Sequence, residues 1–321
     1  MESTVSDLAL DKKVTMKKVL NNIRMLLVLV GLVVIFSILS PYFLTMRNLS
    51  AIGLTISVIG IVCIGQSIVL LTGAFDLSVG SVAGFAGIVV ASLTKAYGMY
   101  PVMFAIGIAI GATIGLINGL LIAKAKVNAL ITTLGMMTIF QGAIFLVSNG
   151  FAVGVNENAF RFLGTTRLLS IPLPIIILLI FYVVFYLVLK YTVFGRYVYS
   201  IGGNPEAARL SGINVDRMRV LTFMLSGGLA AFGGILLASR LGSAQTTAGS
   251  QYPLNSIGAC VLGGIAITGG IGNIWGALIG VAIIGVLKAG LIMVNMPSYY
   301  QWIANGIVLI VAVYLDIRRR N

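Results

Sequence analysis

The sequence predicts an all-α, polytopic transmembrane helical bundle. Of its 321 residues, 59% are hydrophobic and only 9% are charged, whereas soluble domains carry about 25% charged residues. The mean hydropathy is +1.08, and the apolar residues form runs near the roughly 17 to 25 residues that cross a bilayer. This composition excludes a soluble enzyme, a nucleic-acid-binding domain and a disordered chain.

About ten apolar stretches are expected to cross the membrane, of which the first and the eighth are short for full spans. In order along the chain they are Met25–Ser40, Leu49–Leu71, Leu77–Thr94, Met99–Ala123, Ala129–Ser148, Pro172–Leu189, Met218–Ser239, Leu254–Ile267, Ile274–Val294 and Tyr300–Leu315. The longest connections, an inner one at 190–219 and an outer one at 149–171, are too short for a separate soluble domain, so residues 25–316 are predicted to form a single membrane domain. Residues 1–24 and 317–321 are the expected terminal tails.

The basic residues orient this bundle. Of the 21 lysines and arginines, fifteen fall in segments that are internal if the termini are cytoplasmic, five fall in external segments, and Lys288 lies within a span. Cytoplasmic segments of membrane proteins are enriched in lysine and arginine. Both termini are therefore expected in the cytoplasm, and the net charge of +13 indicates orientation and not a nucleic-acid partner.

Glycines recur at four-residue spacing in several predicted spans. Such faces let helix backbones approach closely in lipid. Packing within one bundle is the favoured interpretation, and a dimer face or a moving interface is the alternative. The glycines concerned are Gly80 and Gly84, then Gly107, Gly111, Gly115 and Gly119, and finally Gly272, Gly276 and Gly280.

Sequence signatures of catalysis are absent. The chain has no histidine, no Gly-x-x-x-x-Gly-Lys phosphate loop and no paired carboxylates, which are the usual groups for nucleotide hydrolysis and general acid–base work. We therefore predict no catalytic residue, no metal site and no cofactor bound by this chain.

One acidic residue, Asp76, lies beside a predicted span. It stands in a segment with Gly73, Ser78 and Ser81 that indicates a helix break. A carboxylate at bilayer depth usually faces a cavity, a partner or a break. Two roles fit it: a proton or cation site, or, more commonly, a cap in which Asp76 or Ser78 satisfies the free N–H groups of the next helix.

The other polar side chains within spans are mostly neutral. Gln66, Asn118, Gln141 and Asn255 are candidates for a translocation path or, taken singly, for hydrogen bonds between helices. Neutral hydrogen-bonding groups suit a hydroxyl-rich solute better than an ion.

The long inner connection 190–219 contains a predicted short helix. Asn204 is a favourable N-cap, Pro205 suits the first helical position, and Glu206 complements the helix dipole. The residues that follow favour a helix and then end it: Ala207, Ala208, Arg209, Leu210 and Gly212. An isolated helix of about two turns is marginal in water, so it is expected to pack against another surface.

Several motifs, in order, resemble permease subunits of bacterial ABC monosaccharide importers of the ribose, xylose, arabinose and galactose branch, and arabinose-type permeases most of all. The similarity covers nearly the whole chain. Its motifs are Asp-Leu-Ser-Val-Gly-Ser at 76–81, Asn-Gly-Leu-Leu-Ile-Ala-Lys at 118–124, Ala-Leu-Ile-Thr-Thr-Leu at 129–134, Ile-Gly-Gly-Asn-Pro-Glu-Ala-Ala-Arg-Leu-Ser-Gly at 201–212 and Val-Leu-Gly-Gly at 261–264.

The resemblance implies an ATP-driven importer of the inner membrane, in which this chain forms the path for a monosaccharide such as arabinose, ribose or xylose. It implies a second permease subunit, expected to be an identical copy, a cytoplasmic ATPase that binds ATP and magnesium, and an extracytoplasmic sugar-binding protein. Residues 204–212 match the loop that engages the ATPase. The alternatives are a stand-alone secondary transporter or channel, and ABC import of a nucleoside or furanosyl signal.

Overall fold

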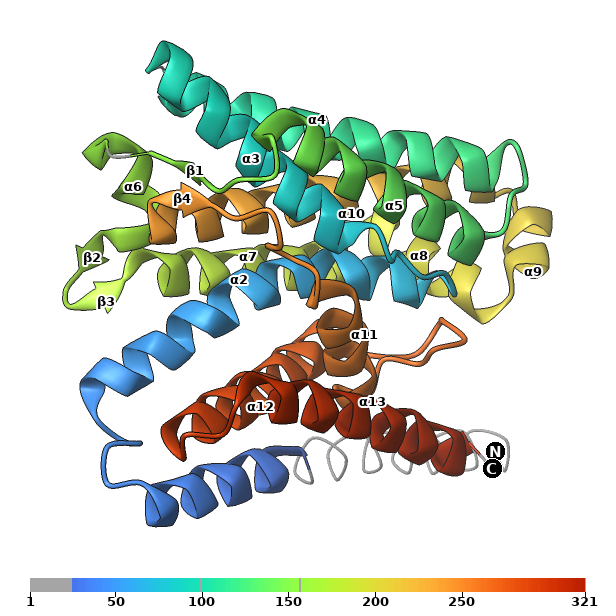
Figure 1. The fold of residues 1–321 in the computed structure, drawn as a ribbon. Coiled ribbons are helices and arrows are strands. Elements are labelled where there is room, and N and C mark those ends of the chain that lie inside the picture. Colours follow the sequence, from blue (N-terminus) through green and yellow to red (C-terminus); the bar gives the residue numbers. More distant parts are fainter. Residues whose placement is uncertain (1–24, 99, 156, 321) are drawn as a thin grey trace.

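The structure, a computed structural model, describes residues 25–98, 100–155 and 157–320, which fold almost entirely into helices (Figure 1). The predicted tail 1–24 lies outside the described residues. The helices are Met25–Leu39, α2 (Met46–Leu71), α3 (Val79–Tyr97), α4 (Tyr100–Ala123), α5 (Ala129–Ser148), α6 (Asn158–Thr165), α7 (Leu173–Tyr191), α8 (Val193–Gly203), α9 (Pro205–Leu210), α10 (Val215–Leu241), α11 (Tyr252–Leu262), α12 (Ile274–Met293) and α13 (Ser298–Arg320).

Seven helices of the described chain are long and apolar enough to cross a membrane: α2, α3, α4, α5, α7, α10 and α12. Each begins and ends within three residues of a predicted span. The chain is thus an all-α membrane protein. The three other predicted spans fall on helix Met25–Leu39, on α11 and on α13.

The predicted eighth span, Leu254–Ile267, needs correction. The helix there, α11, ends at Leu262 after 11 residues, about 16 Å at 1.5 Å per residue. The chain then forms an irregular connection to α12 in which Gly264, Gly269 and Gly270 adopt left-handed backbone angles. Glycine-rich backbone of this kind ends a helix because only glycine enters that region freely.

Glycine faces join α4 to α10. A Cβ added at Gly111 would lie 2.5 Å from the carbonyl oxygen of Gly227, and one at Gly115 would lie 2.1 Å from that of Phe223. The two backbones are therefore in direct contact. The favoured interpretation of these glycines, packing within one bundle, is confirmed for this pair of helices.

A second group of helices packs on α2. Helices α11 and α12 both contact α2, and α13 contacts α11 (Figure 1). Here too glycine permits close approach, since a Cβ at Gly276 would lie 2.0 Å from the carbonyl oxygen of Gly263. On the other side of α2 stands α10, which also packs against α3 and α4.

Two short strand pairs order connections between the helices. Strand β1 (Val153–Gly154) pairs antiparallel with β4 (Ser243–Ala244), and β2 (Arg167–Leu168) with β3 (Ile171–Pro172). The hydroxyl of Ser239 at the end of α10 donates to the carbonyl of Phe160 in α6 at 2.7 Å. The long outer connection predicted at 149–171 is therefore a structured cap that rests on the end of α10.

Candidate functional site

The helix break predicted around Gly73 is present between α2 and α3. Helix α2 ends at Leu71 and α3 begins at Val79. Gly73 has a left-handed φ of 77°. The carbonyl of Leu71, left free by the end of the helix, accepts a hydrogen bond of 2.9 Å from the N–H of Gly270. The break is therefore stabilised by the α11–α12 connection.

Asp76 lies in this break and is fully buried. One carboxyl oxygen accepts hydrogen bonds from the backbone N–H of Ser78 at 3.0 Å and from its hydroxyl at 2.6 Å. The other accepts from the hydroxyl of Ser226 in α10 at 2.8 Å. The amide of Asn118 in α4 donates to the Ser78 hydroxyl at 2.9 Å. This Asp76 network joins the start of α3 to α4 and α10.

Asp76 stabilises the turn before α3 and, among the hydrogen bonds of the described residues, accepts none of the N–H groups of that helix, so the predicted cap is not present. It accepts the N–H of Ser78, the residue that precedes α3, whereas the Ser78 side chain makes no capping hydrogen bond. Among the described residues, no lysine or arginine forms an ion pair with Asp76. Its partners are hydroxyl, amide and backbone groups, so the network ties helices together with neutral donors.

Among the described residues, the remaining path candidates form no hydrogen bond with the Asp76 carboxyl group. Ser81 donates to the carbonyl of Ser78 within the first turn of α3. Gln141 donates to the carbonyl of Thr246, in the connection between β4 and α11, at 3.2 Å. Asn255 is buried in α11. Gln66 is fully buried in α2, and neither its amide nitrogen nor its amide oxygen has a hydrogen-bond partner.

The sequence analysis missed Ser226, which completes the Asp76 network. It lies 150 residues from Asp76. Its only local signal is the small-residue stretch Ser226-Gly227-Gly228 in α10, and many helices in membrane bundles contain such stretches for close packing.

The predicted short helix of the inner connection is α9. The side chain of Asn204 accepts hydrogen bonds from the N–H groups of Glu206 and Ala207, both at 3.0 Å, and Pro205 occupies the first helical position. The helix ends at Leu210, and Gly212 has a φ of 83°. The predicted caps are confirmed. The helix is six residues long, close to the expected length of about two turns.

Helix α9 has an inner face, buried against the permease, and an outer face that is exposed. Ala208 is buried in a hydrophobic cluster with Val198 and Ile201 of α8. Ala207 is exposed, and Leu210 is 82% exposed. The inner face therefore fixes α9 to the permease, and the outer face offers an apolar side chain outside the core.

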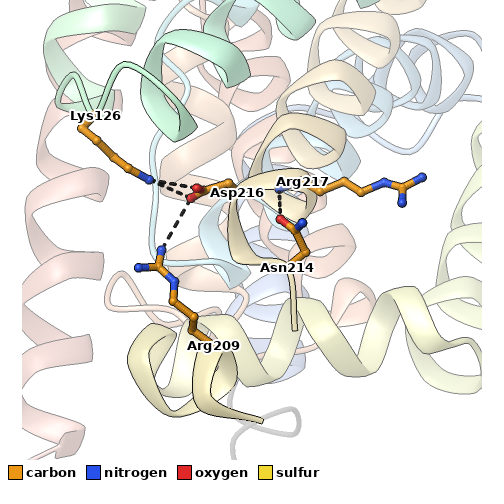
Figure 2. A network of polar contacts seen from close by, with 5 residues as sticks. All are labelled: Lys126, Arg209, Asn214, Asp216 and Arg217. Carbon is orange, nitrogen blue, oxygen red and sulfur yellow. Dashed lines mark hydrogen bonds and ion pairs between the residues drawn. The ribbon is translucent and has the colours of Figure 1, made fainter. Parts of the chain in front are cut away.

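Three charged side chains meet beside α9 (Figure 2). The ammonium group of Lys126 lies 2.8 and 3.0 Å from the two carboxyl oxygens of Asp216, and Arg209 of α9 lies 3.6 Å from one of them. Lys126 belongs to the α4–α5 connection and Asp216 to the first turn of α10. The sequence analysis missed this role of Lys126 and Asp216, because 90 residues separate the two.

Comparison with known families identifies the family of this chain. Residues 48–313 match the family described as branched-chain amino acid transport system, permease component. The chain belongs to this permease family. The match covers the residues of both networks and all of α9.

Named relatives refine the comparison. The chain is 44% identical to the ribose import permease of Bacillus subtilis over 90% of each chain. It is 39% identical to the L-arabinose ABC transporter permease of Azospirillum brasilense, over 95% of this chain and 90% of the relative. It is 41% identical to the L-arabinose transport system permease of Escherichia coli K12, over 91% and 89%. No solved structure matches the chain significantly.

These findings confirm the resemblance to permease subunits of ABC sugar importers. The chain is a multi-pass inner-membrane permease and not an enzyme. A permease of an ABC importer works with a separate ATPase and with a binding protein that delivers the solute.

Proposed function

We propose that this permease forms the membrane path for a pentose. The observation that carries the proposal is its alignment with permeases named for L-arabinose and ribose along about nine-tenths of their length. Buried neutral amides in α2, α4 and α11, at Gln66, Asn118 and Asn255, agree with a hydroxyl-rich cargo. A stand-alone carrier or channel is not favoured by these relatives.

In the proposed assembly two identical copies of the chain form the membrane unit. Each has about ten membrane segments, of which α11 enters the bilayer without crossing it as a continuous helix, and both termini are in the cytoplasm. The excess of lysine and arginine on the inner side supports this orientation. The cytoplasmic ATPase binds ATP and magnesium, and the permease binds neither, since it has no phosphate-binding loop.

The outer face of α9 is the proposed docking element for the ATPase. A leucine with 82% of its surface exposed, Leu210, extends from a short capped helix whose opposite face is buried at Ala208. Removing an apolar side chain of this size from water is favourable when a partner covers it. A helix fixed on one side by the permease and on the other by the ATPase would move with both.

The substrate is tested with the complete transporter. The permease, its ATPase and its binding protein are reconstituted in liposomes, and uptake of labelled L-arabinose, ribose and a nucleoside is measured. We expect ATP-dependent uptake of a pentose. Uptake of the nucleoside alone, or uptake that needs no ATPase, would overturn the proposal.

The docking element is tested with two exposed positions. We expect Ala207→Trp to weaken ATPase binding at least about tenfold, because the added bulk lies on a face that must pack closely, and disrupting such an interface costs about 2 kcal/mol or more. Lys124→Trp, on the exposed α4–α5 connection, is the control and should retain the ATPase. Both proteins should reach the membrane at wild-type levels. Full recovery of ATPase with Ala207→Trp would show that α9 is not the docking element.

A further inference from the structure

A charged link connects α9 to the helix α5. Lys126 lies two residues before Asn128, whose side chain caps α5 by accepting the N–H of Leu130 at 2.8 Å. The backbone around Lys126 is tightly turned, with a φ of 58° and a hydrogen bond of 3.1 Å from Val127 to Leu121 at the end of α4. Lys126 is therefore closely connected to the inner end of α5, and the two should move together.

Asp216 and Arg209 complete the link. Asp216 accepts both short contacts from Lys126 and lies 3.6 Å from Arg209, so its carboxylate stands between a cation of the α4–α5 connection and a cation of α9 (Figure 2). The backbone of α10 is fixed beside it, where Asn214 accepts the N–H of Arg217 at 2.9 Å. Asp216 is therefore a fixed point to which both cations bind.

Helix α5 extends from this link to the outer side. It is 20 residues long, about 30 Å at 1.5 Å per residue. Towards its outer end Gln141 hydrogen-bonds the carbonyl of Thr246 in the β4–α11 connection. Phe140 packs on Phe85 of α3 with ring centroids 5.1 Å apart. A movement of the inner end of α5 would therefore also displace the β4–α11 connection.

The opposite side of α5 is open in the chain described. A Cβ added at Gly135 or at Gly142 would meet no atom within 4 Å. The helix is thus held along one side, mainly by α3, and at these two glycines its other side touches no described part of the chain. Helices α4 and α10, in contrast, touch along their backbones.

We propose that Lys126, Asp216 and Arg209 are positioning residues that transmit the movement of α9 to α5 during transport. This inference rests on the proposed docking of the ATPase at α9. Exposed ion pairs add little to folding stability, so the three charges matter through the orientation that they impose. Such contacts break and re-form easily, as a transport cycle requires.

The experiment uses the complete transporter in liposomes, with L-arabinose and ribose as probes. Lys126→Met, Asp216→Asn and the double variant are compared with wild type. Lys126→Arg retains the charge, and Lys124→Met is the matched control, because Lys124 forms no ion pair with any described residue. Three quantities are measured: ATPase recovered with the permease, ATP hydrolysis without binding protein, and sugar imported per ATP hydrolysed.

We expect the first two quantities to stay at wild-type values in every variant. Sugar imported per ATP should fall about threefold in Lys126→Met and in Asp216→Asn, within the range by which residues of a coupling network act. In the double variant, sugar imported per ATP should fall no further than in either single variant, because the effects of substituting two residues of one contact do not add. Lys126→Arg should recover most of the loss.

Three results would overturn the link. The sugar imported per ATP could stay at the wild-type value in Lys126→Met and Asp216→Asn, or it could fall equally in the control Lys124→Met. The losses of the two single variants could also add up in the double variant. Loss of the ATPase from Lys126→Met would also overturn it, since the charges would then serve docking. Failure of the proposed function is recognised separately, by retention of the ATPase in Ala207→Trp or by import of neither sugar. In that last case, stimulation of ATP hydrolysis by the binding protein replaces the import ratio as the measure of the link.

Discussion

Two aspartates illustrate two ways of holding a carboxylate in this permease. Asp76 is fully buried and accepts hydrogen bonds from neutral groups of Ser78 and Ser226. Asp216 is 37% exposed and is bound by the cations of Lys126 and Arg209. The first joins helices that cross the membrane, and the second joins a surface helix to a connection.

The difference follows from the surroundings. A buried polar group must have its partners in place, since a missing one leaves an unsatisfied group in a medium of low dielectric constant. An exposed ion pair exchanges its partners for water at little cost. The Asp76 network is therefore suited to fixing the bundle and the Asp216 network to moving with α9.

The largest expected effect is on the buried carboxylate. Asp76→Ala removes the acceptor of three hydrogen bonds, and each buried donor left without a partner costs about 1–3 kcal/mol. We expect unfolding free energy to fall by about 3 kcal/mol or more, measured by denaturant titration in detergent. Asp216→Ala should lose less than about 1 kcal/mol. Equal losses would contradict the distinction between the two networks.

The same contrast applies to two glycines. In Gly115→Ala the new methyl group would lie 2.1 Å from the carbonyl oxygen of Phe223, next to the buried network, and we expect a loss of about 1–3 kcal/mol. Gly135→Ala on α5 meets nothing within 4 Å and should be neutral or gain up to about 1 kcal/mol from helix propensity. The melting temperatures of the two variants in detergent check this. A stable Gly115→Ala protein would show that α4 and α10 are not in backbone contact.

A smaller effect is expected at the edge of the buried network. Ser226→Ala leaves one oxygen of Asp76 without its donor, so the unfolding free energy should fall by about 1–2 kcal/mol. Ser211→Ala, which removes an exposed hydroxyl, should change it by less than about 0.5 kcal/mol. If denaturant titrations gave the same unfolding free energy for Ser226→Ala and Ser211→Ala, the hydrogen bond of Ser226 would not contribute to stability.

The smallest effect is on the exposed network. Lys126→Met should lower the unfolding free energy by less than about 1 kcal/mol at low salt. The difference from wild type should shrink in 1 M NaCl, where the Debye length is about 3 Å. The effect of Asp76→Ala should be the same at both salt concentrations. A titration in which salt reduced the Asp76→Ala effect as strongly would place Asp76 in contact with solvent.

The sequence by itself determined the local elements. The seven long apolar helices begin and end within three residues of the predicted spans, because a bilayer requires a minimum apolar length. It also determined α9, since Asn204 accepts the N–H groups two and three residues further along the chain and Pro205 suits the first helical position. A cap of this kind depends on neighbouring residues alone.

The tertiary structure alone decided which residues meet. It brought Ser226 to Asp76 across 150 residues and Lys126 to Asp216 across 90, and it shortened the predicted eighth span to α11. These outcomes depend on how helices are rotated and placed when they pack. Many serines and lysines have the same local surroundings, and only the packed bundle selects the one within hydrogen-bonding distance.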